Sequence, residues 1–223
     1  SGRKTLASNI NLPNAYKRLR CRVKEANISP TVYGCSSDQF SVRPLAITLA
    51  TSASAAAPSA TAAPVVKTGA NFTINATASG NYSGTLTLDS SKLASQTTSQ
   101  TSTQQSGGVV GTLTPTTLVG NASAVNGTYS EVGYLYLTPG AYRDDAFLAV
   151  DSVTGDCITN TTSNNYLSDT LISGKYGCSI GNTTTQALGR FIPDHFAITQ
   201  GSATPACSPS FTYFGQDCFN TLF

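Results

Sequence analysis

Residues 67–79 read KTGANFTINATAS, and this stretch alternates in polarity. Its side chains divide between the two faces of an extended chain, with Phe72, Ile74 and Ala76 on one face and Thr73, Asn75 and Thr77 on the other. A period of two predicts a half-buried β-strand. The stretch 81–91, NYSGTLTLDSS, repeats the pattern through Leu86 and Leu88. We therefore expect two neighbouring antiparallel strands joined through Gly80–Gly84.

Further short runs of the same kind occur along the chain. They are YKRLRCRVKEA (16–26), QFSVRPLAIT (39–48), VVGTLTPTTLVG (109–120), TYSEVGYLYLTPG (128–140), DAFLAVDSV (145–153) and GRFIPDHFAIT (189–199). Only 11% of the 223 residues are charged, and Met and Trp are absent. Such a composition is unlike that of helical proteins, whose solvent faces carry Glu, Lys and Arg. The sequence predicts an all-β fold, an immunoglobulin-like β-sandwich.

Two polar stretches interrupt this pattern. Residues 49–66 are rich in Ala, Ser, Thr and Pro, and residues 90–108 are polar and of low complexity. We expect long polar insertions there. DHFAIT (194–199) is similar to part of DQFSVRPLAIT (38–48). The similarity suggests that each stretch is the first strand of a β-module. The expected domains are therefore the end of a preceding β-module (1–44), the sandwich (45–190) and the start of the next β-module (191–223).

The chain contains six cysteines, at Cys21, Cys35, Cys157, Cys178, Cys207 and Cys218. Their spacing favours three local disulfides, Cys21–Cys35, Cys157–Cys178 and Cys207–Cys218, although fifteen pairings are combinatorially allowed. Metal binding is the weaker interpretation, because the spacing has no CxxC and a single histidine cannot complete the usual zinc ligand sets. Disulfides imply an oxidising compartment, such as the periplasm or the cell surface.

Basic residues concentrate at the start of the chain. Residues 1–48 hold eight of the thirteen Lys and Arg but only two acids, Glu25 and Asp38. A basic segment can bind nucleic acid or an anionic surface. In 16–26, however, the basic residues alternate with Leu19, Cys21 and Val23, which is typical of a strand with a solvated basic face. We therefore expect no nucleic-acid partner.

Four acidic residues are close together in RDDAFLAVDSVTGD, namely Asp144, Asp145, Asp151 and Asp156. Calcium prefers several oxygen ligands, so these residues are calcium candidates. Their spacing does not match an EF-hand loop, and AFLAV between them has the pattern of a strand. We expect exposed turn acids, with no metal and no cofactor.

Two further features raise a chemical alternative. Asp194 and His195 have the residue types of two members of a hydrolase catalytic triad, but no GxSxG motif accompanies them. Adjacent residues on a strand also point to opposite faces. We therefore expect no catalytic residues. In YSEVGYLYLTPGAY, Tyr134 and Tyr136 are candidate ligand-facing aromatics for a sugar. Alternatively, Tyr129 makes a corner hydrogen bond and its neighbours pack between sheets.

Four blocks in order resemble the MshQ-like family of bacterial surface proteins. They are SSDQFSVRP (36–44), YSEVG (129–133), GRFIPDHF (189–196) and FTYFGQ (211–216). That family is associated with mannose-sensitive haemagglutinin (type IV) pili. The resemblance implies an exported, extracellular protein of a bacterial pilus system without established enzymatic activity. It brings no catalytic residues to this sequence.

The function expected from the sequence is non-enzymatic. We expect an extracellular structural or adhesion protein that presents, or forms part of, a bacterial pilus or surface filament. Its partners would be pilus or filament components, and membrane contact would occur only through regions outside this chain. The alternatives are a carbohydrate-binding adhesin module with a glycan ligand, a self-assembling filament subunit and, from another class, a secreted hydrolase that uses His195.

Overall fold

The structure is a computed structural model that describes residues 10–25, 27, 29–53, 66–97 and 107–197. The chain divides into two units, Ser1–Ile192 and Pro193–Phe223. The second predicted boundary, after residue 190, lies two residues before this division, whereas residues 1–44 share the first unit with the sandwich. Cys207, Cys218 and the FTYFGQ block lie outside the described residues.

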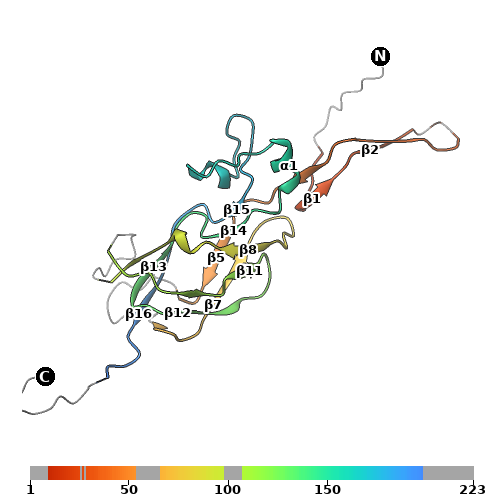
Figure 1. Cartoon of the computed structure of the whole chain (residues 1–223). Coiled ribbons are helices and arrows are strands. Elements are labelled where there is room, and N and C mark those ends of the chain that lie inside the picture. Colours follow the sequence, from red (N-terminus) through yellow and green to blue (C-terminus); the bar gives the residue numbers. More distant parts are fainter. Residues whose placement is uncertain (1–9, 26, 28, 54–65, 98–106, 198–223) are drawn as a thin grey trace, which may run out of the picture. The chain divides into compact units, whose positions relative to one another are not determined.

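The described elements are mostly short strands (Figure 1). The strands are β1 (Tyr16–Leu19), β2 (Arg22–Lys24), β3 (Tyr33–Cys35), β4 (Phe40–Val42), β5 (Thr48–Thr51), β6 (Val66–Lys67), β7 (Phe72–Thr77), β8 (Thr85–Leu88), β9 (Leu93–Gln96), β10 (Leu113–Thr114), β11 (Thr117–Val119), β12 (Val125–Tyr129), β13 (Gly133–Leu137), β14 (Tyr142–Asp144), β15 (Ile180–Gly181) and β16 (Gln186–Ile192). The helical elements are α1 (Ala149–Thr154) and the 3-10 turns η1 (Ser90–Lys92) and η2 (Asn164–Leu167).

Three four-stranded sheets make up the sandwich. Their strand orders are β10-β12-β7-β5, β11-β8-β14-β15 and β6-β16-β13-β9. Neighbouring strands are antiparallel, except that β6 pairs with β16 in parallel. Buried side chains from all three sheets form one apolar core. The structure confirms the predicted all-β sandwich.

Strand β7 has the predicted alternation, because Phe72, Ile74 and Ala76 are buried while Thr73 and Thr77 are exposed. The predicted pairing of β7 with β8 is wrong. β7 pairs with β5 and β12, whereas β8 pairs with β11 and β14 in another sheet.

The connection between β7 and β8 explains this error. Gly80 and Asn81 both have positive φ, at 67° and 51°, and they turn the chain away from a hairpin. The next residue, Tyr82, is only 1% exposed, and its ring packs 5.1 Å from that of Phe147. The chain therefore carries a large side chain through the core as it passes from one sheet to another.

The predicted strand at DAFLAVDSV is also wrong, because the structure forms helix α1 there. The Asp144 carboxylate accepts hydrogen bonds from the backbone amides of Ala146 and Phe147, at 2.8 and 3.0 Å, and so turns the chain directly after β14. Gly155 ends the helix in the left-handed conformation, with φ of 76°. These end signals outweigh a short apolar run, which is ambiguous between helix and strand.

Strand β13 is buried along its whole length. Leu135 and Leu137 face the main core, while Tyr134 and Tyr136 form a second cluster with Ala94 and Ala187 on the other side of the strand. The strand lies between β9 and β16, so both of its edges are hydrogen-bonded. β13 is thus a central strand without a solvent-facing side.

An aromatic group joins two of the sheets inside the core. The ring of Phe191, on β16, lies 4.9 Å from that of Tyr129 on β12 and 5.8 Å from that of Phe72 on β7. The Tyr129 hydroxyl accepts a hydrogen bond of 3.0 Å from the amide of Gly111. The expected corner hydrogen bond of Tyr129 is therefore confirmed.

The structure contains the predicted Cys157–Cys178 disulfide, with a Cα–Cα distance of 5.1 Å. The predicted Cys21–Cys35 bridge is wrong, since both are exposed free thiols. The register explains why. Cys35 lies opposite Arg22, and the amide of Ser36 donates to the carbonyl of Cys21 at 2.8 Å. Ser36 thus faces Cys21, and neighbouring side chains on a strand point to opposite faces.

Residues 16–42 form two small sheets of their own, β1-β4 and β2-β3. We call this segment the arm. Ribbon β2–β3 pairs with no other strand among the described residues, and Pro44 ends the arm before β5. No helix in the described part of the chain is long and apolar enough to cross a membrane.

Gly133 provides a test of the central strand. Its φ is +95°, and a Cβ there would lie 2.3 Å from the carbonyl oxygen of Gln96. We expect Gly133→Ala to lower the free energy of unfolding by about 2–4 kcal/mol, through backbone strain and overpacking. Chemical denaturation measures this loss.

Gly34→Ala is the matched control, because a Cβ at Gly34 would meet nothing within 4 Å. It should change the free energy of unfolding by about 0.5 kcal/mol or less. Equal effects of the two substitutions would contradict the central role of β13.

Candidate functional site

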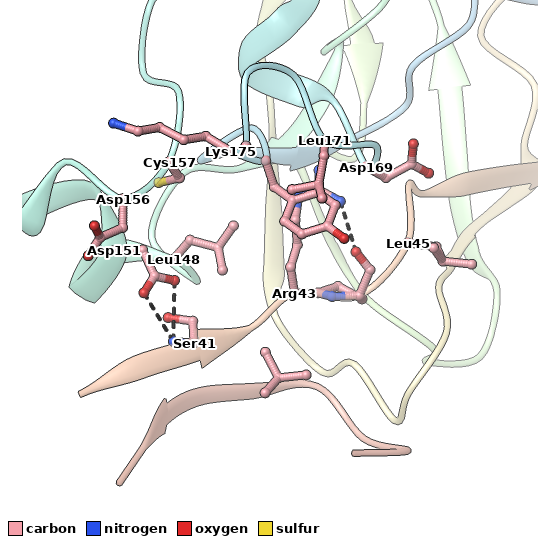
Figure 2. A pocket seen from close by; sticks show the side chains of 14 residues that line it. Ser41, Arg43, Leu45, Leu148, Asp151, Asp156, Cys157, Asp169, Leu171 and Lys175 are labelled. Atoms are coloured by element: carbon pink, nitrogen blue, oxygen red, sulfur yellow. Dashed lines mark hydrogen bonds between the residues drawn. The ribbon is translucent and has the colours of Figure 1, made fainter. Parts of the chain in front are cut away.

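The candidate site is a cavity of about 430 Å³ between the arm and the sandwich. It lies where β4 and the following residues 43–45 meet α1 and the loop 169–176 (Figure 2). That loop belongs to the segment 157–178, which the disulfide closes. The site therefore combines three segments that are distant in sequence.

Arg43 holds these segments together. Its guanidinium donates hydrogen bonds to four backbone carbonyl oxygens, those of Pro44, Leu167 and Ser179 at 2.8 Å and that of Gly177 at 3.2 Å. Burial lowers the pKa of Arg43, while the nearby Asp169 carboxylate acts in the opposite direction. A guanidinium stays protonated in proteins, so these carbonyl groups solvate a partly buried cation.

Three carboxylates surround the cavity, and Figure 2 shows Asp151 and Asp156 on the α1 side with Asp169 opposite them. Both oxygens of Asp151 accept from the amide of Ser41 at 3.2 Å. Asp169 accepts from the amide of Ala46 at 3.1 Å, and Asp156 accepts from the Thr154 hydroxyl. Asp151 and Asp169 thus fix backbone segments around the cavity.

The remaining lining includes Leu45, Leu148, Leu171 and the half-exposed Tyr176. The lining thus combines three carboxylates and two cations, Arg43 and Lys175, with apolar side chains and one aromatic ring. The described residues contain no group of three His, Cys, Asp or Glu side chains able to hold a metal ion.

The four calcium candidates do not converge on one point. Asp144 is buried and accepts from the Tyr82 hydroxyl at 2.9 Å. Asp145 pairs with Arg143 at 3.0 Å and accepts from the Ser179 hydroxyl at 2.5 Å. Asp151 and Asp156 lie on or just after α1. The expectation of exposed turn acids is wrong for Asp144, because its carboxylate is the buried acceptor for two amides and a phenol.

The aromatic sugar platform is likewise not formed. Tyr134 and Tyr136 are both 0% exposed, with their rings stacked 6.4 Å apart, because both faces of β13 are covered. Asp194 and His195 form a pair at 3.1 Å, and His195 has a side chain that is 78% exposed. This pair belongs to the second unit, whereas the residues that line the cavity belong to the first.

Sequence reasoning missed Arg43, Asp169, Lys175 and Tyr176. The signal for Arg43 was present, because a lone cation directly before a proline interrupts the apolar pattern of QFSVRPLAIT. An arginine at such a position needs several acceptors if the strand packs against another segment. Nothing in the sequence identifies those acceptors, since all four are backbone carbonyl groups.

One family model matches the chain, the third domain of DUF6701, over residues 157–222. The match covers the disulfide-closed segment, β15, β16 and most of the second unit, which is less than a third of the chain. The search of curated proteins and the search of solved structures returned no match.

The planar fork of Arg43 can be tested directly. We expect Arg43→Lys to lower the free energy of unfolding by about 1.5–3 kcal/mol, because an ammonium group cannot reach all four carbonyl oxygens from one position. Urea denaturation measures the loss. Arg20→Lys, at an exposed position in the arm, should change stability by about 0.5 kcal/mol or less. A loss of the same size in both variants would refute the role of Arg43.

The ion pair between Asp89 and Arg143, which lies on β14, predicts that the stability of the fold depends on pH. Hydrogen bonds from Ser91 and then from Arg143, whose guanidinium lies 2.6 Å away, lower the pKa of Asp89. A carboxyl group whose pKa is lower in the folded than in the unfolded state stabilises the fold at pH values above its unfolded pKa, about 3.9. That stabilisation is lost as the pH falls through the folded-state pKa.

The advantage of the parent protein over Asp89→Asn should therefore be about 1 kcal/mol or less near neutral pH. It should shrink as the pH falls below about 4. Urea titrations at several pH values measure it, and Arg143→Gln should remove part of the same dependence. A difference that stays constant down to about pH 2 would contradict this assignment.

Proposed function

We propose that this chain is a non-enzymatic structural module of an exported bacterial surface protein, which presents or forms part of a pilus or surface filament. The observation that carries this proposal is the Cys157–Cys178 disulfide within an all-β sandwich. Disulfides persist in oxidising compartments and are rare in the cytosol. The resemblance of the four sequence blocks to MshQ-like proteins supports the pilus assignment.

The cavity supports a structural role. Its polar groups are largely engaged with backbone groups that join the arm, α1 and the disulfide-closed segment. No polar side-chain atom that is fully buried in the described part of the chain lacks a hydrogen-bond partner. Catalytic sites instead present a nucleophile or base toward a cleft.

The alternatives are less well supported. A carbohydrate-binding module needs an exposed aromatic face, but Tyr134 and Tyr136 are buried. A hydrolase needs His195 beside a nucleophile in a protected site, but the His195 ring pairs with the neighbouring Asp194, and both side chains are more than half exposed to solvent.

Mechanical shearing of intact cells of the source bacterium tests the proposal. The chain should appear in the sheared surface fraction, and non-reducing peptide mapping should identify the linked Cys157–Cys178 peptide. A cytosolic enzyme and a known pilin serve as fraction markers. Recovery of the chain with the cytosolic marker and with reduced Cys157 and Cys178 would refute the proposed location.

A further inference from the structure

Ribbon β2–β3 has no core of its own. All six of its residues are exposed, and Val23 is exposed to 71%. An isolated two-stranded ribbon is marginally stable in water, because it buries little apolar surface. The ribbon is therefore a surface that gains stability when a partner covers it.

The base of the arm, by contrast, is fastened to the sandwich unit. The amide of Ser41 on β4 donates to Asp151 of α1, and the Lys17 ammonium lies 5.6 Å from the centre of the Phe147 ring. Just before β1, the amide of Ala15 donates to the carbonyl of Gly80 at 2.5 Å. The arm is thus held at one end and open along the ribbon.

The register shows which backbone groups of the ribbon face outward. The amide of Glu25 donates to the carbonyl of Val32 at 3.0 Å, and that of Ser36 donates to the carbonyl of Cys21 at 2.8 Å. Hydrogen-bonded and non-hydrogen-bonded pairs alternate along an antiparallel ladder. The pairs Arg22–Cys35 and Lys24–Tyr33 are then non-hydrogen-bonded. Arg22 and Lys24 consequently direct their backbone N–H and C=O groups away from β3.

Arg22 and Lys24 are also the positively charged residues of β2. Arg22 and Lys24 are two positions apart on β2, so their side chains share one face, about 7 Å apart. Tyr33 lies on that face, and the Arg22 guanidinium lies 4.7 Å from the centre of its ring. The opposite face of β2 carries the apolar Val23. One edge therefore offers backbone pairing and regularly spaced cations together.

Charge decides among the candidate occupants. Between residues 16 and 42 the arm has five Lys or Arg and two Asp or Glu, a formal charge of +3. Arms of two copies repel each other, which disfavours arm-to-arm pairing. An acidic polysaccharide satisfies the cations but leaves the outward backbone groups of β2 without partners. An acidic polypeptide strand satisfies both.

We propose that the outer edge of β2, residues Arg22–Lys24, binds an extended segment of another protein as an added strand, with carboxylates at alternating positions. Main-chain hydrogen bonds supply affinity in such strand addition, and alternate side chains supply specificity. The carboxylates lie beside Arg22 and Lys24 as cross-strand pairs. This inference goes beyond the proposed function and does not depend on where the protein acts in the cell.

The probe is a synthetic decapeptide of alternating Glu and Thr, titrated into the full chain and followed by amide NMR. A peptide of the same composition in which no two Glu are two positions apart, Glu-Glu-Thr-Thr-Glu-Glu-Thr-Thr-Glu-Thr, is the control for charge alone. The alternating peptide should bind about ten-fold more tightly, because only it places a carboxylate beside each cation. Binding should protect the amides of Arg22 and Lys24 from exchange and should weaken as salt is added.

Four variants separate charge from backbone pairing. Arg22→Ala/Lys24→Ala should weaken binding about ten-fold or more, whereas the charge-matched Arg18→Ala/Arg20→Ala should weaken it by about three-fold or less. Lys24→Pro should weaken it more than Lys24→Ala, because only proline removes the outward amide. The unchanged amide spectrum of the sandwich reports that each variant folds.

Several outcomes would overturn the inference. They are absence of binding to the alternating peptide, equal binding of the two peptides, and binding without protection of the Arg22 and Lys24 amides. Tighter binding of a heparin fragment with no such protection would identify the arm as a polyanion surface instead. Each of these results leaves the cell-fractionation test unaffected.

Discussion

Burial of β13 on both faces is the constraint on which the sandwich depends. A strand with Leu135 and Leu137 on one side and Tyr134 and Tyr136 on the other cannot lie at a surface or at an edge. It requires hydrogen-bonded neighbours on both sides, and β9 and β16 supply them. β16 then brings Phe191 against Tyr129 and Phe72, which ties this sheet to the sheet of β7 and β12. The core thus follows from the position of one strand.

The second constraint is a partly buried cation, Arg43, at the junction of arm and sandwich. An unpaired buried charge costs several kcal/mol, so Arg43 is tolerated only where acceptors surround it. Carbonyl groups of the disulfide-closed segment and its flank provide three of its four hydrogen bonds. The disulfide restricts that segment, and the restricted segment in turn solvates Arg43. The fastened base of the arm depends on both.

Local patterns predicted much of this structure, because alternation and burial are local properties. β7, the Cys157–Cys178 bridge and the corner hydrogen bond of Tyr129 followed from spacing or residue type. Pairing partners did not follow, because they depend on the path between strands. Tyr82 in the core and the positive φ of Gly80 and Asn81 send β8 to another sheet, whereas the stretch Gly80–Gly84 had indicated a hairpin turn. The candidate site escaped prediction because backbone carbonyl groups build it.

Three of the four sequence blocks quoted above occupy structural positions, and the fourth, FTYFGQ, lies outside the described residues. Gly133 of YSEVG pairs with Phe191 of GRFIPDHF across β13 and β16. Tyr129, also of YSEVG, contacts the same Phe191. SSDQFSVRP contributes Arg43 and the β4 anchor Ser41. Residues that fix a core and a junction report on the fold, whereas a ligand is selected by exposed residues. The exposed edge of β2 lies outside all four blocks, so the surface we propose for binding can change its charge pattern without disturbing the scaffold.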